Sequence, residues 1–237
     1  MTNTWVRVIA GGALLLAAGW AQAQETVYSI TGAGTYPSVT NFTPPCALGP
    51  CQDYTTAMGV SGWFRTAAPL APNLSNAQVH AQVTAYSFND GLNTYSSGDP
   101  NGRVLEFRVS TDALGAISFG TSIFLETWQT GTSPHVVGDR LGILRLSRTS
   151  GSGRNNGACG NVSVLPPSGM PDTCMSITVT PSLGGSVPSD AGISWSSAPY
   201  VAPPPTTAIP TLSEWGLIML AGLMGWAGWR VRRRAGR

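Results

Sequence analysis

Residues that could perform catalysis are few in this chain. Nucleophilic catalysis by a serine or cysteine needs a nearby base that a carboxylate holds in place. The only histidines are His80 and His135, and no Gly-x-Ser-x-Gly elbow is present. His80 lies in an alternating, strand-like segment, and His135 follows Pro134 in an expected loop. We interpret both as structural histidines.

Two carboxylates, Glu106 and Glu126, are candidates for the acid–base pair of a glycosidase. Each sits in an alternation of apolar and polar residues, which predicts a strand residue that faces outward. The sequence has no phosphate-binding loop, dinucleotide fingerprint or metalloprotease motif. We therefore expect a protein that is not an enzyme and needs no cofactor, with a secreted hydrolase as the least favoured alternative.

A polar stretch offers a second kind of site. Asp90, Asn93, Asp99 and Asn101 carry the oxygen atoms that Ca²⁺ prefers as ligands. Their spacing does not match an EF-hand loop, and Asp-Gly and Asp-Pro are ordinary turn formers. The turn interpretation is therefore favoured over calcium, and no metal site is expected.

Aromatic residues suggest a third kind of site. Trp63, Trp128 and Trp195 could form a platform on which sugar rings stack. Burial in a core explains large aromatic residues equally directly and is the favoured interpretation. A glycan or matrix polymer stays an alternative partner.

The four cysteines favour disulfides over a zinc site, because the two histidines lack ligand spacing. Four cysteines allow three connectivities. We favour the local one, Cys46–Cys51 and Cys159–Cys174, because each pair flanks a loop rich in glycine and proline. All four cysteines lie in the part of the chain that we expect to be exported, where oxidation is possible.

The elements that position these residues are predicted to be strands. Several segments alternate apolar and polar residues, and Gly, Asn, Asp and Pro turn signals separate them. These segments are 55–64, 79–88, 104–109, 117–119, 123–128, 141–146 and 175–179. The spacing predicts an all-β ectodomain over 24–197, an antiparallel β-sandwich of about 8–10 strands.

The first 23 residues are typical of a secretory signal peptide. Arg7 precedes an apolar run over 8–20, and Ala21-Gln22-Ala23 matches the small-residue cleavage pattern. We expect a signal helix that signal peptidase removes after passage through the secretion translocon, so that Gln24 starts the mature chain. An uncleaved anchor is the alternative.

The end of the chain has its own organisation. Residues 198–208 form a proline-rich linker, and 209–237 form a tail. An apolar run predicts a transmembrane helix over 212–229 in the inner membrane. Basic residues follow it and are expected to keep this end in the cytoplasm. They are Arg230, Arg232, Arg233, Arg234 and Arg237.

The tail resembles the IPTL-CTERM protein-sorting domain, which is similar in design to PEP-CTERM tails. The residues that carry the resemblance are Ile209, Pro210, Thr211, Leu212, Glu214, Trp215 and Gly216, followed by the apolar run and the arginines. The resemblance implies recognition, and removal of the tail near residues 209–212, by an exosortase-like membrane enzyme. A permanent single-pass anchor is the alternative.

A second resemblance covers part of the expected strands. The segments 62–64, 68–74, 86–91 and 109–117 resemble a β-domain of PEP-CTERM-type exported proteins. This resemblance implies a fold and an exported location, and it brings no catalytic residues.

Charge excludes one class of partner. Between Gln24 and Ala208, seven arginines stand against ten carboxylates, a formal charge of −3. Such a domain has no electrostatic footprint for nucleic acid. We expect a precursor in the membrane and a mature protein at the envelope, the cell surface or outside the cell. It would be a structural or matrix-associated component, or alternatively a carbohydrate- or cell-binding module of the lectin or adhesin type.

Overall fold

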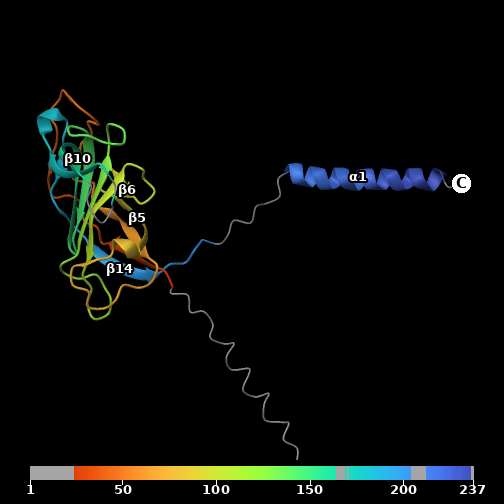
Figure 1. Ribbon diagram of the computed structural model, residues 1–237, viewed down its shortest axis with the longest axis horizontal. Coiled ribbons are helices and arrows are strands. Elements are labelled where there is room, and N and C mark those ends of the chain that lie inside the picture. The colour runs from red at the N-terminus through yellow and green to blue at the C-terminus, as the bar shows by residue number, and fades with distance from the viewer. Residues whose placement is uncertain (1–23, 164–168, 170, 204–211, 236–237) are drawn as a thin grey trace, which may run out of the picture. The chain divides into compact units, whose positions relative to one another are not determined.

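A computed structural model describes residues 24–163, 169, 171–203 and 212–235. The predicted signal helix and the cleavage residues Ala21 and Ala23 lie outside them; Gln24 is the first described residue. The chain divides into two compact units, up to Tyr200 and from Val201 onward. The first holds every described strand, and the second holds α1 (Leu212–Ala235) (Figure 1).

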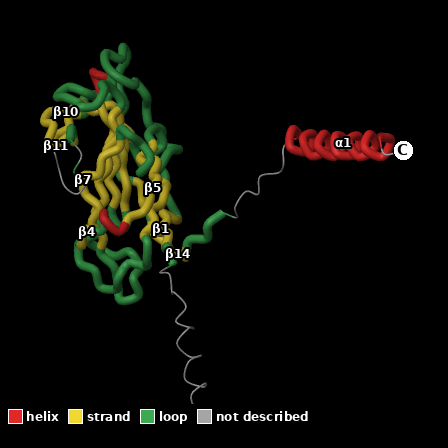
Figure 2. The backbone as a smooth tube through the Cα atoms, turned by 45° about the vertical axis from the view of Figure 1, so that its right-hand side comes forward, coloured by secondary structure: helices red, strands yellow, loops and turns green. Residues whose placement is uncertain are grey.

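Two antiparallel sheets make up most of the first unit (Figure 2). The five-stranded sheet has the order β14-β1-β3-β5-β6, from Ser194–Pro199, Thr26–Thr31, Ser61–Thr66, Val83–Asn89 and Thr94–Ser96. The larger sheet has the order β11-β10-β9-β8-β7-β4, from Thr173–Thr178, Ser150–Ser163, Arg140–Leu146, Ser122–Trp128, Gly102–Val109 and Ala77–Gln78, with β13 (Ala191–Gly192) paired to β10. A short ribbon joins β2 (Val39–Thr40) to β12 (Val187–Pro188). The all-β, antiparallel class predicted from the sequence is confirmed.

The two sheets share one apolar core. Phe64 of β3 meets Phe107 of β7 edge to face, with ring centroids 5.1 Å apart, and Tyr28 of β1 stacks on Phe64 at 4.8 Å. Strands β8 and β9 add Ile123, Leu125, Leu144 and Leu146 to the same cluster. Burial of these side chains is the main free energy that holds the sheets together, about 1.5–3 kcal/mol for each large side chain.

The strand register puts a second set of residues on the outer face of the larger sheet. Phe124 of β8 lies opposite Arg145 of β9, which lies opposite Ser152 of β10. One pair further along, Glu126 lies opposite Ile143, and Ile143 lies opposite Arg154. Because side chains alternate along a strand, all of these residues share one face. This face carries the groups that the following sections describe.

Some element boundaries differ from the sequence prediction. Residues 151–153, a Gly-Ser-Gly stretch outside every predicted strand, are part of β10; Gly151 lies against Val60 and Leu146, and Gly153 against Tyr54 and Asp90. His80 is not in a strand: it begins the 3₁₀ turn η1 (His80–Gln82), which breaks the predicted segment 79–88 before β5. A second such turn, η2, spans Pro181–Leu183. Strand β14 runs two residues into the predicted linker, to Pro199, and pairs there with Thr26.

The helix of the second unit, α1, covers the predicted transmembrane segment. Within the described part of the chain, no helix is both long and apolar enough to cross a membrane. The transmembrane helix predicted over 212–229 is therefore not shown, although α1 covers these residues. Glu214 lowers the mean hydropathy of residues 212–229, and the four glycines and three tryptophans of this run do not raise the mean. The helix also continues into the basic residues as far as Ala235.

Candidate functional site

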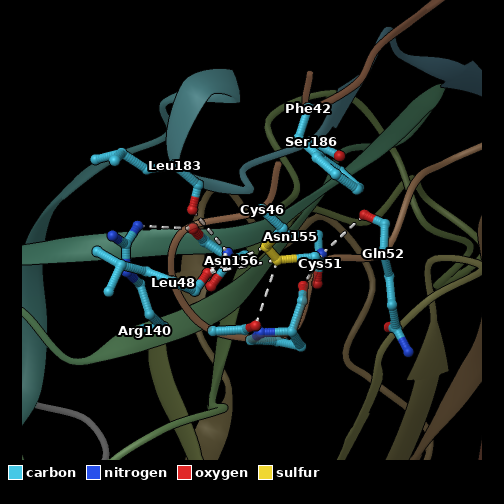
Figure 3. Close-up of a disulfide and its surroundings, with 12 residues drawn as sticks. Phe42, Cys46, Leu48, Cys51, Gln52, Arg140, Asn155, Asn156, Leu183 and Ser186 are labelled. Atoms are coloured by element: carbon cyan, nitrogen blue, oxygen red, sulfur yellow. Dashed lines mark hydrogen bonds between the residues drawn. A yellow bond between two sulfur atoms is a disulfide. The ribbon is translucent and has the colours of Figure 1, made fainter. Parts of the chain in front are cut away.

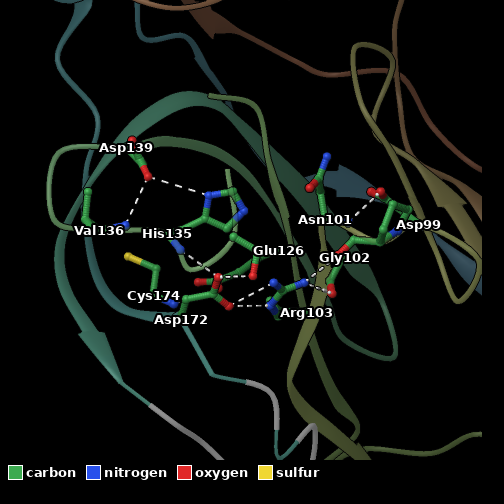
Figure 4. A network of polar contacts seen from close by, with 12 residues as sticks. Asp99, Asn101, Gly102, Arg103, Glu126, His135, Val136, Asp139, Asp172 and Cys174 are labelled. Carbon is green, nitrogen blue, oxygen red and sulfur yellow. Dashed lines mark hydrogen bonds and ion pairs between the residues drawn. The ribbon is translucent and has the colours of Figure 1, made fainter. Parts of the chain in front are cut away.

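Buried ionisable groups gather beside the outer face of the larger sheet, where β11 and the loop after β8 lie over it (Figure 4). Glu126 of β8 is 1% exposed, and its Oε2 accepts a hydrogen bond from the backbone N–H of Cys174 at 3.2 Å. Burial raises the pKa of Glu126 to about 8, although that hydrogen bond and the charge of Arg103 act in the opposite direction. Glu126 is therefore protonated at neutral pH. Glu126 does lie on the outer face, as expected, but β11 covers it there, so it is not exposed to solvent.

Arg103 and Asp172 form a buried ion pair next to Glu126. Arg103 of β7 is the cross-strand partner of Glu126, and its guanidinium donates to Oδ1 of Asp172 from Nη2 at 2.8 Å and from Nε at 3.2 Å. Oδ2 of Asp172 accepts hydrogen bonds from the backbone N–H of His135 and the hydroxyl of Ser133. Burial alone would raise the pKa of Asp172, but these hydrogen bonds and the arginine charge lower it.

His135, in the loop after β8, is the third buried ionisable side chain beside Glu126. It is 3% exposed, and its ring stacks on Trp128, with centroids 4.4 Å apart. Its Nδ1 lies 3.5 Å from Oδ2 of Asp139, and neither ring nitrogen makes a hydrogen bond to a described residue. The described hydroxyl that joins this group, Ser133, donates to Asp172 and not to the imidazole. The cluster therefore lacks the contact between nucleophile and base that acyl transfer needs.

A second buried polar network surrounds Asp90, in the turn between β5 and β6. Its carboxylate accepts hydrogen bonds from the hydroxyls of Tyr54 at 2.7 Å and Tyr95 at 2.8 Å, and from the backbone N–H groups of Leu92 and Asn93. Burial raises the pKa of Asp90, and these donors partly offset it. The carboxylate oxygens are already engaged with protein donors.

The proposed calcium ligands therefore do not converge. Asp90 and Asn93 belong to the buried network, whereas Asp99 accepts from the backbone N–H of Asn101 and from the Thr127 hydroxyl. Across the described residues, no group of three or more His, Cys, Asp or Glu side chains could hold a metal ion. The turn interpretation of these residues agrees with the contacts.

Two adjacent asparagines of β10 join the Asp90 network to the first disulfide loop (Figure 3). Asn155 donates to the carbonyls of Pro50 and Gln52, both at 3.1 Å, and Asn156 donates to the carbonyl of Leu48. Gln129 donates to Oδ1 of Asn155 at 2.8 Å. Both predicted disulfides, Cys46–Cys51 and Cys159–Cys174, are present.

The remaining predicted site residues lie apart from one another. Glu106 forms a surface ion pair with Arg108 at 3.2 Å. His80 is half-buried, and burial lowers its pKa. Trp195 packs against Phe64 and Phe88 on the inner face, Trp128 lies on the outer face of the other sheet, and Trp63 alternates with Phe64 on β3. These tryptophans share no surface and form no platform.

The tail is where the comparisons with known proteins give a result. Leu212 begins α1, with Glu214, Trp215 and Gly216 in its first turns, while residues 209–211 lie outside the described residues. The model of the IPTL-CTERM motif matches residues 207–235. The tail is an IPTL-CTERM motif. The motif indicates a protein with a sorting tail of the exosortase-dependent type, with an exosortase-like sorting system as its partner. No curated protein and no solved structure matches the chain.

The sequence did not predict the burial of Arg103, Asp172 and Glu126. Asp172 follows Pro171 in a stretch that has the composition of a loop, which gives no indication of burial. A signal for Glu126 did exist: Phe124 and Trp128, its neighbours on the same face of the strand, are both apolar, which indicates that this face is covered.

Proposed function

We propose that this chain is an exported protein of the cell envelope or surface, whose tail is recognised and removed by an exosortase-like membrane enzyme. Its β-rich ectodomain would act as a structural or matrix-associated component. The observation that carries the proposal is the IPTL-CTERM motif at residues 207–235, attached to a disulfide-bonded all-β unit. A cleaved signal peptide with Gln24 as the new N-terminus belongs to the same proposal.

The two disulfides support export. Such bonds persist in oxidising compartments and are rare in reduced ones. Cys159–Cys174 joins β10 to β11, and Cys46–Cys51 closes the loop that Asn155 and Asn156 hold. Both are therefore integrated into the fold of the first unit.

The composition of α1 supports recognition of the tail by a partner. Its described apolar side chains are at least half exposed, namely Leu217, Ile218, Met219, Leu220, Leu223, Met224, Trp226 and Trp229. A continuous apolar surface of this kind is typical of an interaction site. Arg230 lies over the ring of Trp226, 4.1 Å from its centroid, at the start of the basic end of the helix. An enzyme that binds the tail would contact these residues.

We also propose that the ectodomain is not catalytic. The ionisable groups with the most perturbed environments, Glu126, Asp90 and Asp172, are each at most 5% exposed and engaged with internal donors. A substrate has no access to them in this arrangement. The second candidate function, a carbohydrate- or cell-binding module, is favoured by an arginine-lined groove that the next section describes.

Replacement of the motif tests the sorting proposal. In a host with an exosortase-like system, a variant with Pro210→Ala and Trp215→Ala is expected to accumulate as unprocessed precursor. Pro204→Ala is the control, because it changes a proline of the linker that precedes residues 207–235, and it should be processed normally. Mature and precursor forms are separated by immunoblotting of cell fractions. Normal processing of the double variant would count against recognition of this motif.

A further inference from the structure

A polar groove of about 320 Å³ lies on the outer face of the larger sheet. Arg145 of β9 and Arg154 of β10 line it, together with Ser122, Ser147 and Ser152 and one carboxylate, Asp190. None of the residues that line it belongs to the buried cluster around Glu126. The groove is therefore a separate feature of the surface.

The register of the sheet brings the two arginines together. Arg145 lies opposite Ser152, and Arg154 is two residues further along the same face of β10. Diagonal neighbours of this kind are about 7–8 Å apart, within reach of long side chains. Burial and, second, the charge of Arg145 lower the pKa of Arg154. Two like charges are thus held close together on a partly buried surface.

Neither guanidinium has a polar partner among the described residues, in either an ion pair or a hydrogen bond. Arg145 lies over the ring of Phe124, 4.6 Å from its centroid, which holds the guanidinium in place by a cation–π contact. Two further outer-face arginines are already paired, Arg108 with Glu106 and Arg103 with Asp172. Arg145 and Arg154 therefore keep their hydrogen-bond donors available for an anion.

The chemistry of the groove favours a particular anion. A guanidinium fork matches the two oxygens of a carboxylate, and serine hydroxyls both donate and accept hydrogen bonds, as sugar hydroxyls require. Asp190 in the groove and the charge of −3 over residues 24–208 leave no general attraction for a polyanion, so that binding must rest on specific hydrogen bonds. The ligand should therefore carry both carboxylates and many hydroxyls, which polyphosphate lacks.

We propose that this groove binds a carboxylate-bearing polysaccharide, with Arg145 and Arg154 holding a uronate carboxylate and the serine hydroxyls contacting the sugar. The inference rests on the proposed function, because an exported, matrix-associated protein meets such polymers outside the cell. It names the class of polymer that the ectodomain would associate with.

Binding of polygalacturonate to the purified full chain, measured by calorimetry, tests the inference. Neutral dextran and inorganic polyphosphate are the comparison polymers. Arg145→Gln and Arg154→Gln are each expected to weaken polygalacturonate binding about tenfold or more, since each removes charge-assisted hydrogen bonds. Arg108→Gln is the matched control, because it removes the same charge from the same face outside the groove, and it should change the affinity less than twofold.

A further variant separates loss of the site from loss of the fold. Ser152→Asp places a carboxylate between the two arginines, where it would pair with them and block the ligand. We expect an unchanged or higher unfolding temperature together with loss of polygalacturonate binding. The inference is overturned if wild type does not bind polygalacturonate, if it binds polyphosphate or dextran equally well, if Arg108→Gln weakens binding as much as the groove variants, or if Ser152→Asp still binds. None of these results would affect processing of the tail, which is scored separately.

Discussion

The Oε2 atom of Glu126 in β8 lies 3.2 Å from the backbone nitrogen of Cys174 in β11, although β9 and β10 separate these strands in the sheet. The larger sheet must therefore curl so that β11 lies over the outer face of β8. This curvature explains how a glutamate on the outer face becomes 1% exposed. It also explains why a group that sequence reasoning placed in solvent is protonated in the folded protein.

Stability should depend on pH through Glu126. Its pKa is about 8 in the folded protein and 4.5 as its ordinary value, so the folded state holds a proton that the unfolded state releases between these values. The contribution of Glu126 to the free energy of unfolding is fully present below pH 4.5. It is lost as the pH rises toward 8, at up to about 1.4 kcal/mol per pH unit. Glu126→Gln should flatten this dependence in denaturant titrations from pH 5 to pH 8. Glu106→Gln, on the surface, should leave it unchanged; equal slopes for Glu126→Gln and wild type would refute the assignment.

Removal of the Asp172 carboxylate should be strongly destabilising. Asp172→Asn leaves the charge of Arg103 buried without its counter-ion, which costs about 3–5 kcal/mol. The comparison variant is Glu25→Gln, which breaks the surface pair with Arg65 at 3.3 Å and should cost less than about 1 kcal/mol. Urea unfolding measures both. Similar small losses would mean that the buried pair does not hold the loop after β8.

The loss of stability on removing a tyrosine hydroxyl should be larger for a hydroxyl that contacts Asp90 than for one that does not. Tyr95→Phe removes a donor at 2.8 Å from a buried carboxylate and should cost about 1.5–3 kcal/mol. Tyr86→Phe changes a buried tyrosine whose hydroxyl makes no hydrogen bond to a described residue, so its cost should be much smaller. Thermal unfolding of the two variants at one pH gives the comparison. A larger loss for Tyr86→Phe would contradict the role given to Asp90.

The two disulfides should contribute unequally. Cys159–Cys174 has a sequence separation of 15 and Cys46–Cys51 one of 5, so the loop-closure model assigns them about 3 and about 2 kcal/mol. Loss of Cys159–Cys174 also frees the strand that presents the N–H of Cys174 to Glu126. Paired serine variants, compared by denaturant unfolding, should show the larger loss for positions 159 and 174. The reverse order would indicate that the loop at 46–51 has the greater part in holding β10.

The sequence was sufficient for the fold class, the disulfide pairing and the tail, and insufficient for the buried polar groups. Alternation predicts strands such as β7 and β8 because one face of each packs on the core. It missed β10, because glycines there allow close approach to the core: a Cβ at Gly153 would lie 2.7 Å from the Cβ of Asp90. Local composition assigns these residues to a turn, and tertiary packing makes them a strand.

For the tail, the sequence predicted the motif but not the hydropathy of the helix. The motif residues in their order, followed by the apolar run and the arginines, were enough to recognise the IPTL-CTERM motif, since a short linear motif does not depend on the fold of the rest of the chain. The transmembrane helix predicted over 212–229 is not shown, because Glu214 and the glycines lower the mean hydropathy of this segment.

Mass spectrometry of the C-terminus of the mature protein, isolated from a host with an exosortase-like system, tests the central claim most directly. We predict a mature chain that begins at Gln24 and ends near residues 209–212, without α1. A mature protein that retains Arg237 would contradict processing at the motif.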